Sequence, residues 1–164
     1  MERIDRIMAH PAFLNSLKRL KAAEKKRKFC HHGMKHLLAV ARIGYIDVLE
    51  KGLPIPKDIM YAAGLLHDVG KYIQYEEGVP HHLGGSKLAD QILEDCGYTE
   101  QERQEICAAI RNHSNQGGVD GDVAEGSLDD VLYRADKASR NCFRCKQRAS
   151  CNWPEDKKNS GIIS

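Results

Sequence analysis

Apolar residues recur every three or four positions through most of this chain, and that period restricts it to helical folds. Between about residues 33 and 50 the recurring positions are Leu37, Val40, Ala41, Ile43, Tyr45, Ile46 and Leu49. Such spacing is typical of one face of an amphipathic α-helix. No segment alternates apolar and polar residues as a half-buried strand does. We therefore expect an all-α protein.

The other helices are expected over about residues 11–28, 57–72, 83–96, 99–113 and 127–140. Thr99 and Glu102 have the spacing of a capping box, which marks the start of a helix. Gly52 is placed to end the helix expected over about residues 33–50. The glycine-rich segment 114–126 is expected to be a loop. Because 164 residues suit one domain, we predict a single bundle of five to seven helices over residues 1–140, with its core at about 30–140. A short cysteine-rich tail, 141–164, would pack on it.

Composition narrows the class of protein. The net charge is only +2 and aromatic residues make up 6%, which argues against a nucleic-acid-binding surface. The basic run at 18–28 is expected to be a solvated helix face, with a site for an anionic partner as the alternative. No apolar run approaches the roughly 20 residues of a membrane span, and no secretory signal is evident, so we expect a cytoplasmic protein. The sequence leaves oligomerisation open.

Histidines and aspartates lie within or at the ends of otherwise apolar helices. His67 and Asp68 end the apolar run that begins at residue 62. Imidazole and carboxylate are common metal ligands, and an unpaired polar side chain in an apolar setting is costly. A shared metal site would account for all of these residues, although each alone could be a capping or core residue. The candidates are His36, His67, Asp68, His81 or His82, His113 and Asp136.

Three segments resemble the HD superfamily of metal-dependent phosphohydrolases, a family of helical bundles. They are "HLLAVA" at 36–41, "LLHDVGK" at 65–71 and "ADK" at 135–137. The signature of that family is a histidine, a distant His-Asp doublet and a final aspartate. The resemblance covers roughly residues 30–140 and implies four metal ligands, namely His36, His67, Asp68 and Asp136.

Two more segments resemble the branches of the family that bind two ions. They are "HHLGGSKLA" at 81–89 and "AAIRNHS" at 108–114, and they imply that His81 and His113 are further ligands, with Asp68 bridging the ions. We expect one or two divalent ions, with iron or manganese favoured and magnesium, cobalt, nickel or zinc as alternatives. His31 and His32 compete with His36 as first ligand. His32 could instead orient a ligand or contact the substrate.

The resemblance implies hydrolysis of a phosphoester or phosphoanhydride in a small phosphorylated metabolite, with a nucleotide favoured. A bound divalent ion lowers the pKa of a coordinated water from about 15.7 toward about 7. The expected catalytic residues are Asp68, Lys71 and Arg140, with Lys137 as a further substrate contact. The order of ligands with "ADK..R" resembles the dinucleoside-tetraphosphate hydrolases, although the cysteine tail is not part of their pattern. The alternative is a nucleotide- or metal-sensing module without turnover.

Three cysteines follow the last helix in a C-x2-C-x5-C arrangement: Cys142, Cys145 and Cys151. Two cysteines two residues apart can bind one zinc ion or part of an iron–sulfur cluster. Cys30 or His31 would then be the fourth ligand of a structural metal. The alternative is that these thiols are reduced and help to pack Trp153 and Phe143 on the bundle.

Overall fold

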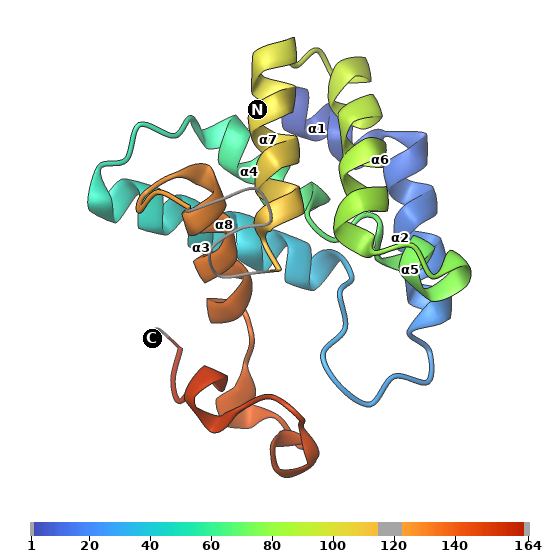
Figure 1. The fold of residues 1–164 in the computed structure, drawn as a ribbon, viewed down its shortest axis with the longest axis vertical. Helices are drawn as coiled ribbons and strands as arrows, with labels where there is room; N and C mark the ends of the chain where they lie inside the picture. The colour runs from blue at the N-terminus through green and yellow to red at the C-terminus, as the bar shows by residue number, and fades with distance from the viewer. Residues whose placement is uncertain (1, 115–122, 163–164) are drawn as a thin grey trace.

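The computed structural model describes residues 2–114 and 123–162, and the described residues contain α-helices and 3-10 turns but no strand. The all-α fold is therefore confirmed (Figure 1). The expected loop at 114–126 lies partly outside the described residues. The α-helices are α1 (Glu2–Ala9), α2 (Pro11–Ala23), α3 (Met34–Lys51), α4 (Lys57–Leu66), α5 (Lys71–Glu77), α6 (His81–Asp95), α7 (Glu100–Asn112) and α8 (Leu128–Ala138).

Local signals in the sequence place several helix ends correctly. Thr99 begins α7 with the expected capping box, in which the Glu102 backbone N–H donates to the Thr99 hydroxyl and the Glu102 carboxylate accepts from the Thr99 backbone. Gly52 ends α3 in the left-handed conformation, with φ of 63°. These ends depend on contacts within a few residues, which is why the sequence alone predicts them.

Two expected helices are shorter in the structure than predicted. The first ends at Ala23 instead of residue 28, because the Glu24 carboxylate turns inward and accepts from the backbone N–H of His32, 2.9 Å away. The helix expected over 57–72 ends at Leu66, and the separate helix α5 begins at Lys71. The turn between them carries His67 and Asp68.

Helix α4 lies at the centre of the bundle. Seven of its ten residues are buried, and it packs against α1, α3, α7 and α8. The pairs α3–α4 and α6–α7 form the largest helix contacts. Cys96 and Cys107 are buried apolar positions of this core, as expected. No described helix is long and apolar enough to cross a membrane.

The chain after α8 forms three short 3-10 turns, Cys142–Arg144, Arg148–Ser150 and Glu155–Lys157, which extend from one end of the bundle (Figure 1). Asn159 ties this segment back to α8, because its side-chain amide donates to the carbonyl oxygens of Lys137, Ala138 and Arg140. The tail therefore packs against the C-terminal end of α8. The division of the chain at about residue 140 stays a prediction.

Candidate metal centre

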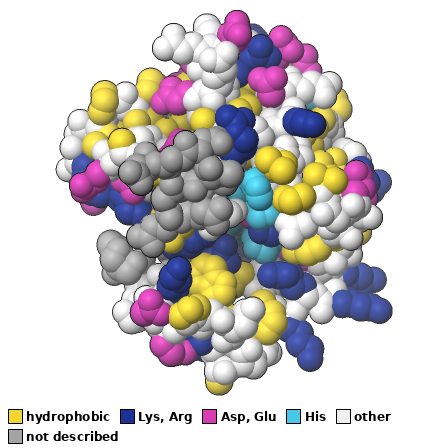
Figure 2. All heavy atoms as spheres, in the orientation of Figure 1, with side chains coloured by type: hydrophobic (Ala, Val, Ile, Leu, Met, Phe, Trp, Pro, Cys, Tyr) yellow, Lys and Arg dark blue, Asp and Glu magenta, His cyan; other side chains and the backbone are white. Residues whose placement is uncertain are grey.

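Five separate segments bring the six predicted ligands to one place in the bundle. The turn after α4 supplies two of them, and the others come from α3, the first residue of α6, the end of α7, and α8. The residues are His36, His67, Asp68, His81, His113 and Asp136. All six side chains are mostly or fully buried. Figure 2 shows histidine side chains in a hollow of the surface, with lysines and arginines around it.

The six side chains form two groups that share Asp68. Its Oδ2 lies 3.5 Å from Nε2 of His36 and 3.3 Å from Nε2 of His67. Its Oδ1 lies 3.7 Å from Nε2 of His81 and 3.6 Å from Nε2 of His113. Each carboxylate oxygen therefore faces one pair of histidines, and each triad could hold one metal ion.

Asp136 belongs to the first of these groups. Its Oδ1 lies 3.3 Å from Nε2 of His36 and 3.9 Å from Nε2 of His67. The arrangement thus has two imidazoles and the carboxylate of Asp136 on one side of Asp68 and two imidazoles on the other. His36 belongs to the first triad, whereas His32 lies outside both triads.

The other ring nitrogen of every histidine in the centre is hydrogen-bonded to an oxygen. Nδ1 of His67 donates to the Gly64 carbonyl at 2.8 Å, and Nδ1 of His113 donates to the Ile110 carbonyl at 2.6 Å. A carbonyl only accepts, so these nitrogens carry the proton and both Nε2 atoms present lone pairs. Hydrogen bonds of this kind orient imidazoles that bind metals.

Side chains perform the same task for the other two histidines. Nδ1 of His81 lies 2.6 Å from Oε1 of Gln74, and Nδ1 of His36 lies 3.1 Å from the Ser139 hydroxyl. The Ser139 hydroxyl donates its own hydrogen to a backbone carbonyl, so it accepts from His36. No sequence pattern marked Gln74 or Ser139, because each meets its histidine only through the packing of the fold.

The spacing of the lone pairs fits metal ions. The Nε2 atoms of His36 and His67 lie 3.2 Å apart, and those of His81 and His113 lie 3.3 Å apart. Two imidazole nitrogens that bind one ion at about 2.1 Å lie roughly 3 Å apart when the bonds meet near a right angle. Without a cation between them, paired lone pairs in a buried site would repel one another. The donor set therefore fits an ion in each triad.

The electrostatic environment keeps both carboxylates ionised. Burial alone would raise the pKa of Asp68, but its interactions with His67 and Lys71 and its hydrogen bonds with neighbouring histidines outweigh burial and hold that pKa well below its usual range. For Asp136 the effect of burial is likewise outweighed, chiefly by the hydrogen bond with His36, and its pKa is also well below the usual range. Both groups are therefore available as anionic ligands.

Two of the imidazoles are held neutral. Burial lowers the pKa of His67, while burial and the nearby Lys71 lower that of His81 to about 3. For His36, burial is outweighed by hydrogen bonds with Asp136 and Asp68, and its pKa is raised. A neutral imidazole is the form that binds a metal, so His67 and His81 could each accept an ion without first releasing a proton.

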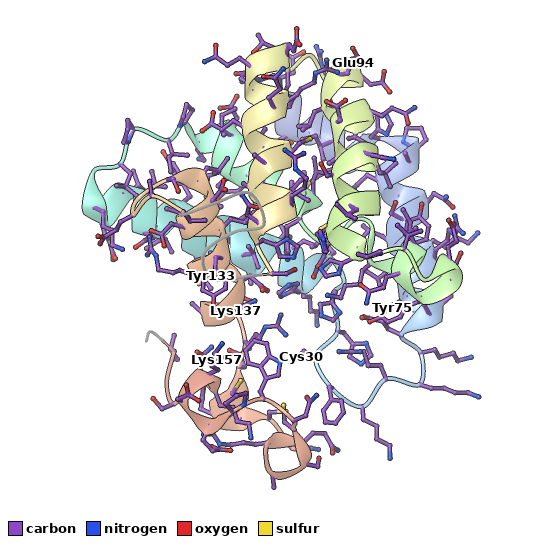
Figure 3. The ribbon with its side chains drawn as sticks, viewed as in Figure 1. Cys30, Tyr75, Glu94, Tyr133, Lys137 and Lys157 are labelled. Atoms are coloured by element: carbon purple, nitrogen blue, oxygen red, sulfur yellow. The ribbon has the colours of Figure 1, made fainter. Side chains whose placement is uncertain are left out.

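Three predicted cations surround the carboxylates. Lys71 Nζ lies 3.4 Å from Oδ1 of Asp68, Lys137 Nζ lies 2.7 Å from Oδ2 of Asp136, and a terminal nitrogen of Arg140 lies 3.1 Å from Oδ1 of Asp136. Figure 3 shows Lys137 near the end of α8, on the side that faces the tail. These cations are placed to meet an anion that approaches the centre.

His32 is buried beside the centre and is fixed by an acidic partner. Its Nδ1 lies 2.5 Å from Oε1 of Glu24, which also accepts from the hydroxyl of Tyr75 at 3.1 Å. The His32 ring meets the ring of His36 edge to face, with centroids 5.6 Å apart. His31 is largely exposed, and His82 is partly so.

Comparison with known proteins gives a family match over most of the chain. Residues 33–141 match the HD domain family. An uncharacterized protein of Clostridium beijerinckii is 40% identical over 162 residues, which is 99% of both chains. No solved structure gave a significant match.

More distant relatives carry functional names. Ribonuclease Y of Clostridium kluyveri is 29% identical over 126 residues, which cover 77% of this chain but only 21% of that protein. YueE of Bacillus subtilis, provisionally named a phosphohydrolase, is 27% identical over 115 residues, 64% of each chain. The chain therefore spans about a fifth of ribonuclease Y and less than two thirds of YueE.

Proposed function

Because the chain belongs to the HD domain family, we propose that it is a metal-dependent phosphohydrolase acting on a small phosphorylated metabolite, with a nucleotide as the favoured substrate. The observation that carries this proposal is Asp68, whose two oxygens each face a pair of histidines. The reaction would be attack of water on the phosphorus of a phosphoester or phosphoanhydride. Similarity to a protein named as a phosphohydrolase supports this class of reaction.

The two triads suggest how two ions would be held. His36, His67, Asp68 and Asp136 would hold the first, and Asp68, His81 and His113 the second. Bound divalent ions would lower the pKa of a coordinated water toward about 7 and polarise phosphoryl oxygens. Histidine and carboxylate ligands suit iron or manganese, which we favour.

The cations around the centre would bind the phosphoryl oxygens. Lys71 approaches from the side of Asp68, while Lys137 and Arg140 approach from the side of Asp136. Positive charge at these positions would stabilise the negative charge that develops on the phosphoryl group. Asp68, Lys71 and Arg140 are thus our proposed catalytic residues. Glu24 holds His32 by its Nδ1, and we propose that His32 offers Nε2 to the substrate.

The test is a hydrolysis screen of the full chain loaded with Mn²⁺ or Fe²⁺ under anaerobic conditions. The panel should hold nucleoside mono-, di- and triphosphates, dinucleoside polyphosphates, cyclic dinucleotides and, because of the similarity to ribonuclease Y, a short RNA. We expect metal-dependent release of product that Asp68→Asn abolishes. The matched control is Asp95→Asn, an exposed aspartate that pairs with His10 outside the centre.

Two outcomes would count against the proposal. Failure to bind metal after reconstitution would remove the catalytic centre. Metal binding together with tight binding of one nucleotide, but no turnover of any compound in the panel, would favour the sensing module instead. A sensing module has no activity to abolish. In that case the effect of Asp68→Asn should be weaker nucleotide binding.

A further inference from the structure

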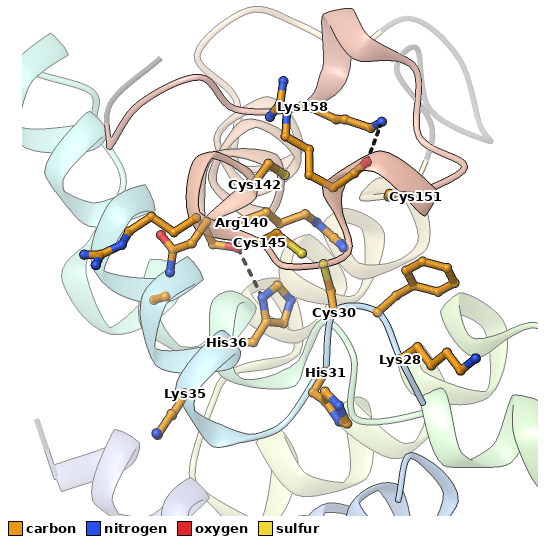
Figure 4. Close-up of a pocket in the computed structure, with 16 residues that line it drawn as sticks. Lys28, Cys30, His31, Lys35, His36, Arg140, Cys142, Cys145, Cys151 and Lys158 are labelled. Atoms are coloured by element: carbon orange, nitrogen blue, oxygen red, sulfur yellow. Dashed lines mark hydrogen bonds between the residues drawn. The ribbon is translucent and has the colours of Figure 1, made fainter. Parts of the chain in front are cut away.

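Four of the six cysteines line a single cavity beside the metal centre. The cavity has a volume of about 420 Å³ and lies between the loop that joins α2 to α3 and the tail. Its cysteines are Cys30 from the loop and Cys142, Cys145 and Cys151 from the tail. Figure 4 shows these four side chains around the same opening. The other two, Cys96 and Cys107, are buried in the core of the bundle.

Tight turns of the tail position its three cysteines. The backbone N–H of Cys145 donates to the carbonyl of Cys142 at 3.1 Å, which closes the first 3-10 turn. The N–H of Cys151 donates to the carbonyl of Arg148 at 3.3 Å and closes the second. The carbonyl of Cys30 accepts from Nε of Arg27 at 2.7 Å, which fixes the loop opposite. All four cysteines are therefore held by the backbone around one space.

The spacing of these thiols does not suit a single ion. A zinc ion bound at about 2.3 Å holds its sulfurs within about 4 Å of one another. Among the described residues, the groups of three or more ligand atoms that lie within 4.8 Å of one another contain histidine and aspartate but no cysteine. A four-iron cluster holds its four cysteine sulfurs farther apart, because iron and sulfide atoms lie between them. The open cavity provides the room for it.

The lining of the cavity is positively charged, which favours a negatively charged ligand. Its described lining contains no carboxylate, and it includes six basic residues, Lys28, Lys35, Arg140, Arg144, Arg148 and Lys158. The Arg140 guanidinium lies against Cys30, and its buried Nε has no hydrogen-bond acceptor among the described residues. An unsatisfied buried donor is costly, so an acceptor in the cavity is expected. A cluster bound by four thiolates is anionic, and hydrogen bonds to its sulfurs are usual.

We propose that Cys30, Cys142, Cys145 and Cys151 together bind a four-iron, four-sulfide cluster, as a second metal centre separate from the histidine–aspartate centre. The cluster would join the α2–α3 loop to the tail. These two segments adjoin the centre, since His36 follows the loop on α3 and Asp136 precedes the tail on α8. The cluster would therefore hold in place two segments that adjoin the helices carrying His36 and Asp136.

Acid-labile sulfide separates the two centres, because a histidine–aspartate site that binds iron contains no sulfide. The full chain should be purified anaerobically, reconstituted with ferrous iron and sulfide, and assayed for iron, sulfide and the electron paramagnetic resonance signal after reduction. We expect about four sulfides per chain. Cys145→Ser and Cys30→Ser should each lose the sulfide and the signal. His81→Ala, which alters only the first centre, should keep both.

The matched control is Cys107→Ser, because Cys107 donates its S–H to the carbonyl of Ser86 in the core and a serine hydroxyl can do the same. It should keep the sulfide. Cys30→Ser leaves the tail unchanged, so the proposal can still be tested if the tail variants fail to fold. Circular dichroism shows whether each variant is folded. One zinc per chain without sulfide, lost in Cys145→Ser, would overturn the proposal. Absence of sulfide after reconstitution would overturn it as well.

Discussion

The side-chain oxygen of Gln74 lies 2.6 Å from Nδ1 of His81 and 3.2 Å from the backbone N–H of the same residue. One oxygen thus fixes both the start of α6 and the ring of its first residue. Because Nδ1 donates to Gln74, Nε2 is the nitrogen that faces Asp68. The short helix α5 therefore supports the second triad although it supplies no ligand to it.

Removal of this oxygen should weaken the second metal site. Gln74→Met keeps the length of the side chain but loses the acceptor, so we expect the affinity for the second ion to fall roughly 10- to 100-fold. Gln74→Glu keeps an acceptor and should remain close to the wild type. Competition with a chelator for Mn²⁺ measures the two affinities. Equal affinity in the Met and Glu variants would show that the hydrogen bond does not orient His81.

The shared position of Asp68 predicts how many ions each variant loses. Asp68→Asn should reduce the occupancy of both ions, because one oxygen faces each triad. His81→Ala should reduce the occupancy of one. Elemental analysis after anaerobic reconstitution gives the number of ions per chain. Loss of a single ion in Asp68→Asn would contradict a bridging role for this residue.

The sequence predicts the six residues of the centre but not the hydrogen bonds that orient them. The candidate ligands are recognisable because a few residue types recur at spacings that match the motifs of the HD family. Gln74 and Ser139 are ordinary polar residues, and they reach His81 and His36 only because the helices pack together. The hydrogen bonds that orient His67 and His113 depend on local structure instead. Each histidine lies at the end of a helix, and its Nδ1 donates to the backbone carbonyl three residues earlier.

The predicted helix ends are wrong where tertiary contacts overrule the local preference for helix. The segment after Ala23 has good helix formers, yet it turns because the buried Glu24 carboxylate binds His32. The helix before His67 ends at Leu66, and the turn that follows brings Gly70 against the backbone of α6. The side chains of His67 and Asp68 thereby enter the centre from a turn. The cysteine tail was open to two interpretations because Cys30, which lines the same cavity, lies in another segment, 112 residues before Cys142.

Gly70 should be indispensable because the backbone of α6 lies against it. A Cβ at this position would lie 2.3 Å from the nitrogen of Gly85 and 2.7 Å from the carbonyl oxygen of His81. Neither backbone atom can move without shifting α6, so Gly70→Ala should lower the free energy of unfolding by about 2 kcal/mol or more. Urea denaturation measures the change. Gly33→Ala is the control, since nothing lies within 4 Å of its Cβ, and a similar loss there would contradict the explanation.

The ion pair between Arg3 and Glu102 predicts a pH dependence of stability. Arg3 on α1 donates to Glu102 on α7 at 2.8 Å, and it also pairs with Asp58 on α4, so it connects three helices. The hydrogen bond from Arg3 is the main reason that the pKa of Glu102 lies below its ordinary value of 4.5. Because the folded state binds this proton more weakly than the unfolded state, the stabilisation is complete above the ordinary pKa. It is lost as the pH falls through the lowered one.

Glu102→Gln keeps the capping geometry but removes the charge, so it should cost about 1 kcal/mol of unfolding free energy at pH 7. The difference from the wild type should shrink as the pH falls below the ordinary value of 4.5 and through the lowered pKa of Glu102, because the wild-type carboxylate then becomes protonated. Urea denaturation of both proteins across this range measures it. In an Arg3→Met background the same substitution should cost much less, since the partner is already gone. A cost that is unchanged by acid and by Arg3→Met would mean that Glu102 acts through the helix cap alone.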